Sequence, residues 1–350
     1  MSIDTYENDV LKENSVSEFS ERDVFDEKND NRKFSVWGKI RKHINPVVAF
    51  ILVMVFILSV VAIVLSISTV KLKAKTRELE GLHRGVYDKT QEIVLTEEGD
   101  RITTYNYAYG QVSIPAIAGV PKSTYKDENF STDSDGFKHY YIDGERRSYV
   151  GIDVSEHNGS INWDKVKDAG VDFVMLRIGG RGWGEEGVMY ADSAFMTNLT
   201  GARDAGLMVG AYFFSQAITE AEAIEEAEFS LEILGGESLD YPLAFDWETI
   251  DSGVDARTDN IAPETLTKCA RAFCDRVKEA GYTPCLYTGT TLAYYKYDLG
   301  KLSDIDIWYA YFGDSPALYY NYMMWQYSST GRVDGVSGDV DLNICFKNYK

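Results

Sequence analysis

Two carboxylates follow a buried apolar strand in the segment LAFDWETIDSG, residues 243–253. In a strand, residues two apart point to the same face, so Asp246 and Glu248 should project together while Trp247 faces away. Two acids side by side in a half-buried cleft repel each other, which raises one pKa enough to keep a proton at neutral pH. A protonated carboxyl beside a carboxylate is the pair that cleavage of an acetal needs, although an Asp-x-Glu pair taken alone also fits a solvated loop.

Two distant aspartates follow the same pattern at the ends of other expected strands. Asp153 lies in YVGIDVSEHNG and Asp341 lies in GDVDLNICF. Closing a barrel makes the first and last strands neighbours, so we expect these aspartates to meet at one mouth. Four carboxylates without metal-ligating histidines fit glycoside hydrolysis better than zinc chemistry, and a calcium or magnesium site is the competing interpretation.

The elements that must position these acids begin at Tyr149, where β-branched or aromatic runs start to alternate with amphipathic stretches. Strands are expected at 149–154, 171–178, 207–215, 241–247, 284–287, 306–310, 324–327 and 341–346. Helices are expected at 161–169, 191–205, 219–234 and 263–280, each ending at a glycine that suits a left-handed cap. This alternation predicts an α/β fold, a parallel β/α barrel whose active-site face lies at the carboxyl ends of the strands. The strands from Asp306 onward leave little room for helices, so we expect an irregular barrel there.

Aromatic and basic side chains accompany the acids on the same strands. Arg177 follows an apolar strand, where it could pair with an aspartate or contact substrate. Four aromatic residues are candidates for stacking on sugar rings, with core packing as the alternative: Tyr212, Tyr287, Trp308 and Trp325.

An uncharged apolar run at 47–70 is long enough to cross a bilayer as one helix, and it exceeds the hydrophobic part of a signal peptide. We therefore predict a single transmembrane helix. The acidic residues 1–46 are expected to form a disordered tail, and residues 71–148 a stalk or spacer with a small β module. Basic residues flank both ends of the run, so charge alone leaves its orientation undecided.

Composition narrows the possible partners. The formal net charge of −20 argues against nucleic acid as a partner, because no basic surface would release counterions from phosphate. The 4 cysteines and 4 histidines form no cluster at ligand spacing, so we expect no metal and no cofactor. The cysteines lie in apolar surroundings and are interpreted as small buried hydrophobes, with a disulfide framework as the alternative.

Six segments together resemble glycoside hydrolase family 25, the lysozymes that cut peptidoglycan as β-1,4-N-acetylmuramidases. They are GIDVSEHNGSINW at 151–163, GAYFFSQA at 210–217, AFDWE at 244–248, LYTG at 286–289, IWYA at 307–310 and MWQYSSTGRVDGVSGDVDLN at 324–343. The resemblance covers about residues 149–350. It implies that Glu248 is the general acid and that Asp246 steadies the positively charged intermediate or orients the N-acetyl group of the substrate. Asp153 and Asp341 match the remaining acidic members.

The expected whole is a membrane-anchored peptidoglycan hydrolase. Because peptidoglycan lies outside the membrane, the tail would be cytoplasmic and the barrel extracellular. Its partners would be glycan strands, the membrane and a wall-remodelling or secretion assembly. The alternatives are a non-catalytic wall-binding module and a scaffold that uses its activity only to open a local gap in the wall.

Overall fold

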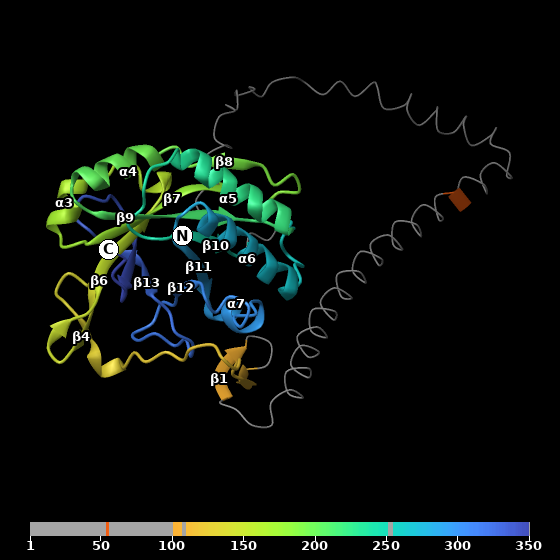
Figure 1. The fold of residues 1–350 in the computed structure, drawn as a ribbon, viewed down its shortest axis with the longest axis horizontal. Coiled ribbons are helices and arrows are strands. Elements are labelled where there is room, and N and C mark those ends of the chain that lie inside the picture. The colour runs from red at the N-terminus through yellow and green to blue at the C-terminus, as the bar shows by residue number, and fades with distance from the viewer. Residues whose placement is uncertain (1–53, 56–100, 107–109, 251–254, 350) are drawn as a thin grey trace, which may run out of the picture. The chain divides into compact units, whose positions relative to one another are not determined.

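Strands from Tyr149 onward close into a barrel (Figure 1). This computed structural model describes residues 54–55, 101–106, 110–250 and 255–349. The eight barrel strands are β6 (Tyr149–Val154), β7 (Phe173–Arg181), β9 (Met208–Ser215), β10 (Leu243–Trp247), β11 (Pro284–Gly289), β12 (Asp306–Ala310), β13 (Met324–Gly331) and β14 (Val340–Cys345). Their order around the barrel is β6, β14, β13, β12, β11, β10, β9, β7, and β7 pairs back to β6. Only β14 runs antiparallel to both of its neighbours in this ring.

Helices connect most of the parallel strands, as the alternating pattern predicts. They are α3 (Trp163–Asp168), α4 (Phe195–Asp204), α5 (Glu220–Leu234), α6 (Pro263–Glu279) and α7 (Thr290–Tyr295). Local sequence sets their ends: the Asn162 side chain caps α3, Thr219 caps α5, and Gly235 ends α5 in the left-handed conformation. The described chain has no helix between β12 and β14, which confirms the expected irregularity. Helix α7 and the short strand β8 (Met189–Ala191) were not predicted, because so few residues show no clear periodicity.

Side chains on the strands alternate between two hydrophobic layers. The outward layer packs against the helices, and the inward layer fills the barrel with Phe173, Met175, Tyr241, Ala244, Cys285, Trp308, Met324 and Cys345. Gly151 is required on β6, since a Cβ there would lie 2.2 Å from the ring of Phe173. All four cysteines are buried and free, which confirms their interpretation as small core residues.

The described part of the segment before the barrel includes residues that pack on β13 and β14, on the side that lacks helices. It contains two small antiparallel sheets, one of β1 (Arg101–Asn106) and β2 (Gly110–Pro115), the other of β3 (Phe130–Thr132), β4 (Lys138–Ile142) and β5 (Glu145–Arg146). A turn of 3-10 helix, η1 (Asp127–Asn129), precedes β3, and another, η2 (Glu156–Asn158), follows β6. Strand β4 contacts β6 and β14, so this sheet lies where the barrel closes.

Aromatic side chains form the contact between this segment and the barrel. The ring of Phe130 packs edge-on against Trp325 at 5.6 Å, and Tyr125 lies 4.1 Å from Phe346. The hydroxyl of Tyr327 accepts a hydrogen bond from the backbone of Lys138. The two small sheets therefore share a hydrophobic core with the barrel.

Three expectations concern residues that the structure does not describe. The tail at 1–46 and the stalk at 71–100 lie outside the described residues, as does the apolar run at 47–70 apart from Met54 and Val55. Within the described residues, no helix combines the length and the apolar character needed to cross a membrane.

Candidate active site

Strand alternation brings the predicted aspartates to one mouth of the barrel. Gly151 and Ala244 belong to the inward-facing positions of β6 and β10. Asp153 and Asp246, two residues further along, therefore also face inward, near the carboxyl ends of their strands. On the antiparallel strand β14 the inward-facing Cys345 is followed, going back along the chain, by Asn343 and Asp341.

Asp153 lies directly opposite Asp341 in the register of β6 and β14. One carboxylate oxygen of Asp153 accepts hydrogen bonds from Gln326 Nε2 at 2.8 Å and from Asn343 Nδ2 at 2.7 Å. Asp153 is buried, whereas Asp341 is half-buried. The predicted meeting of the first and last strands is thus present, and two amide groups missed by the sequence reasoning hold one of the acids.

Asp246 and Glu248 form the second acidic pair. Asp246 is buried, and its Oδ1 has no hydrogen-bond partner. Glu248 lies one residue beyond the end of β10, and it is exposed to solvent. Burial raises the pKa of both carboxyls, and the charge of Glu248 raises that of Asp246 further, so the two groups compete for protons. The pair thus places one acid in the barrel and the other at its rim.

Burial is the main cause of the pKa shifts at the mouth. It raises the pKa values of Asp153 and Asp246 well above the ordinary value for aspartate, and the nearby charges of Asp341 and Glu248 add to these shifts. Burial also raises the pKa values of Glu248 and Asp341. Although solvent reaches Glu248, protein surrounds its carboxyl closely enough to disfavour the charge. The four groups therefore keep protons at a higher pH than isolated carboxyls do.

Two of the predicted tyrosines belong to the same mouth. Tyr212 and Tyr287 pack edge-on against the ring of Trp308, with ring centroids 5.9 and 4.9 Å away. The hydroxyl of Tyr287 donates to Gln326 Oε1 at 2.9 Å, and Gln326 in turn donates to Asp153. Burial raises the pKa of both phenols, and the carboxylate charges raise it further, so both remain neutral donors.

Arg177 faces the mouth but is paired with acids that the sequence reasoning did not select. Its Nε lies 2.8 Å from Asp192 Oδ2, and its Nη2 lies 3.2 Å from Glu156 Oε1. Its guanidinium also lies over the ring of Tyr190. The charge of Arg177 opposes the rise in the pKa of Asp246, which is the electrostatic role considered for it. Its nearest partners, however, are not among the four catalytic acids expected from the sequence.

The two predicted tryptophans do not offer a face to a sugar. Trp308 is 1% exposed and donates its indole N–H to Asn343 Oδ1 at 2.8 Å inside the barrel. Trp325 is fully buried on the outward face of β13, covered by Phe130. Their expected stacking on substrate is therefore corrected to core packing, because protein atoms already cover both rings.

The residues that the sequence reasoning missed are mostly polar partners of the acids. Asn343 could have been found, because it lies two residues from Asp341 and so on the same face of its strand. Gln326 could have been found in the same way, because it lies two residues after the inward-facing Met324 on the same strand. Asp192 and Glu156 lie just outside strands, where no periodicity marks them.

Within the described residues, no group of three or more His, Cys, Asp or Glu side chains is arranged to hold a metal ion.

Comparisons with known proteins agree with this geometry. The model of the glycosyl hydrolases family 25 matches residues 152–336. The chain is 33% identical over 196 residues to the autolytic lysozyme of Clostridium acetobutylicum, covering 55% of this chain and 54% of that protein. It is 34% identical over 204 residues to lysozyme M1 of Streptomyces globisporus, covering 55% of this chain and 66% of that protein. The match therefore spans between about half and two thirds of these two relatives.

A solved structure has the same fold. The modular autolysin LytC of Streptococcus pneumoniae aligns with a TM-score of 0.51 and 23% identity, covering 70% of this chain and 57% of that one. That autolysin has also been solved in complex with a synthetic peptidoglycan ligand. The likeness shows that the mixed α/β eight-stranded barrel is shared by the two proteins.

Proposed function

The chain belongs to the glycosyl hydrolases family 25, and on this basis we propose that it is an N-acetylmuramidase. It would hydrolyse the β-1,4 bond between N-acetylmuramic acid and N-acetylglucosamine in peptidoglycan. Two lysozymes that share about a third of their aligned residues with this chain support the proposal.

The observation that carries the proposal is the pairing of buried Asp246 with exposed Glu248 at the barrel mouth. A buried acid alone could not reach a polymeric substrate, and an exposed acid alone would ionise at neutral pH. The exposed member is open to a glycan strand, and the buried member lies close enough for the two carboxyls to compete for a proton. The pair therefore supplies both a donor and a carboxylate.

Hydrolysis follows from these positions. Glu248 donates its proton to the glycosidic oxygen as the bond to the anomeric carbon breaks, and the neighbouring carboxylates stabilise the positive charge that develops on the sugar. Water then adds to the anomeric carbon, and its released proton returns to Glu248. A glycan lying over the mouth displaces water from Glu248, which raises its pKa further and favours the proton-donating form. Tyr212 and Tyr287 are placed to contribute neutral hydroxyls beside this reaction.

Product analysis tests the proposed bond. Purified peptidoglycan of known composition would be incubated with the full-length chain, and the released fragments reduced and analysed by mass spectrometry. New reducing ends on N-acetylmuramic acid are expected. Reducing ends on N-acetylglucosamine would contradict the assigned bond, and saturable binding without new ends would indicate a wall-binding module.

We further propose that the chain is anchored in the cell membrane by residues 47–70, with its N-terminus in the cytoplasm and the barrel outside. The uncharged apolar run supports an anchor, and the location of peptidoglycan supports the orientation. Anchoring would confine hydrolysis to the nearby wall, as local remodelling or the opening of a gap for a secretion assembly requires. Protease added to intact wall-stripped cells should digest the barrel, and protection of the barrel would contradict this orientation.

A further inference from the structure

Strand pairing positions the backbone of Asp246 but does not extend to Glu248. The ladder between β10 and β9 ends at Trp247 and Ser215, and the ladder between β10 and β11 ends at Asp246. The Glu248 side chain is exposed, so core packing does not fix it either. Residues just beyond the end of β9 reach the backbone of Glu248.

Gln216 supplies such a contact. It follows the last residue of β9 and is fully buried. Its Nε2 donates to the carbonyl oxygen of Glu248 at 3.0 Å and to that of Ser215 at 2.8 Å. Its Oε1 accepts the hydroxyl of Thr258 at 3.0 Å. One side chain thus joins the residue that begins the loop after β10 to Thr258, which lies ten residues further along the chain.

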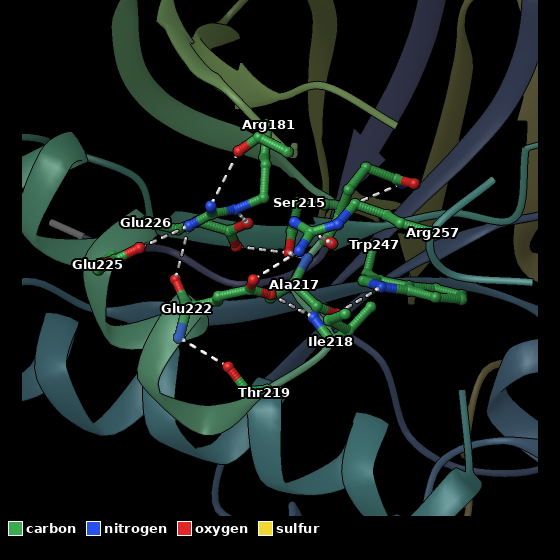
Figure 2. Close-up of polar contacts among 12 residues, drawn as sticks. Arg181, Ser215, Ala217, Ile218, Thr219, Glu222, Glu225, Glu226, Trp247 and Arg257 are labelled. Carbon is green, nitrogen blue, oxygen red and sulfur yellow. Dashed lines mark hydrogen bonds and ion pairs between the residues drawn. The ribbon is translucent and has the colours of Figure 1, made fainter. Parts of the chain in front are cut away.

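A second set of contacts holds the same region. Figure 2 shows Arg257 and Glu222 in contact beside the end of β9, and their Nη2 and Oε1 atoms are 2.5 Å apart. The backbone N–H of Arg257 donates to the carbonyl oxygen of Trp183, and its Nη1 lies 3.4 Å from that of Gln216. The indole N–H of Trp247 donates to the Ala217 carbonyl oxygen at 3.2 Å. Buried, charge-assisted contacts of this kind keep a backbone in one place.

We propose that Gln216, through its bonds to Glu248 and Thr258, is a positioning residue that holds Glu248 at the correct distance from Asp246 and the glycosidic oxygen. This inference rests on the proposed function. A displacement of about 1 Å can cost roughly 100-fold in rate, so loss of the Gln216 side chain should act on the chemical step. Substrate binding along the rest of the mouth should change little.

Kinetics on soluble peptidoglycan fragments, using the full-length chain, test this role. In Gln216→Ala we expect kcat to fall by roughly 100-fold, with KM within about twofold of its original value. The acidic limb of the kcat profile should move to lower pH, because Asp246, which acts as a carboxylate, loses part of the effect of the Glu248 charge on its pKa. Thr258→Val should show the same changes to a smaller extent, and Thr258→Ser should restore kcat.

Thr267→Val is the matched control. Thr267 is another buried threonine with one side-chain hydrogen bond, which it accepts from the Asp298 backbone in another part of the structure. Its replacement should leave kcat and the pH profile unchanged. The inference would be overturned if folded Gln216→Ala and Thr258→Val kept the original kcat, or if Thr267→Val lost as much. Should Gln216→Ala fail to fold, the three threonine variants decide. An unmodified chain that releases no fragments would instead overturn the proposed function, and the inference with it.

Discussion

Asp153 and Asp341 face each other across strands β6 and β14, at the junction where the barrel closes. Like charges directly opposite each other in a sheet are destabilising. Gln326 and Asn343 offset the charge on Asp153 by donating to it. The last two strands of the barrel therefore supply both the opposing acid and the groups that partly neutralise the first one.

Replacement of Asp341 by Asn should make the protein more stable but less active. Loss of the repulsion across β6 and β14 should raise the free energy of unfolding at pH 7 by about 0.2–1 kcal/mol, while hydrolysis falls. Urea unfolding and release of reducing ends would be measured on the same preparations. Asp334→Asn, which removes an exposed aspartate paired with Lys165, is the control. A loss of more than about 1 kcal/mol in Asp341→Asn would show that this charge is compensated in the folded protein.

Replacement of Asp246 by Asn should change the pH dependence of stability. The pKa of Asp246 in the folded protein is raised above its ordinary value of 3.8. Its stabilising effect is therefore complete below that pH and is lost as the pH rises through the folded-state value. Relative to the original chain, Asp246→Asn should gain stability as the pH rises from 3.8 to the folded-state pKa of Asp246, by about 1.4 kcal/mol for each unit of the removed shift.

Unfolding in urea at several pH values would measure that trend. Asp204→Asn, at an exposed position at the end of α4, is the control. The free energy of unfolding would be plotted against pH for Asp246→Asn and for the original chain. Two plots that run parallel from pH 4 to pH 8 would contradict the electrostatic account of the site.

The contact between the N-terminal segment and the barrel also makes a prediction. Phe130 is partly buried against Trp325, so Phe130→Ala should lower the free energy of unfolding by about 1–2 kcal/mol, less than the loss of a fully buried side chain. Phe312 is 59% exposed, and Phe312→Ala should change stability very little. Denaturant unfolding of both variants makes the comparison. If Phe130→Ala and Phe312→Ala were equally stable, the contact between the N-terminal segment and the barrel would not stabilise the fold, and the segment would be only a spacer.

Periodicity made most of the barrel and its acids predictable. The two-residue repeat that buries Ala244 also directs Asp246 inward, and barrel closure brings Asp153 to Asp341. The same repeat could not identify the aromatic residues that meet substrate. It assigns Trp325 to one face of a strand, but the segment that covers this face lies almost 200 residues earlier in the chain.

The partners of Arg177 were unpredictable for a related reason. Glu156 and Asp192 lie just beyond the ends of strands, and only the folded chain brings them to the guanidinium. Gln216 was within a recognised motif, but its role depends on where the pairing of β9 and β10 stops. The positions of strand ends and loop contacts follow from tertiary packing, which local sequence patterns do not specify.

The most direct test of the catalytic account is the rate at which Glu248→Gln releases reducing ends from peptidoglycan. Loss of a general acid should lower kcat by about 100- to 10,000-fold while thermal unfolding remains close to that of the original chain. Glu279→Gln, at an exposed position at the end of α6, should keep full activity. Folded Glu248→Gln that releases sugar at the original rate would contradict the assignment of the proton donor.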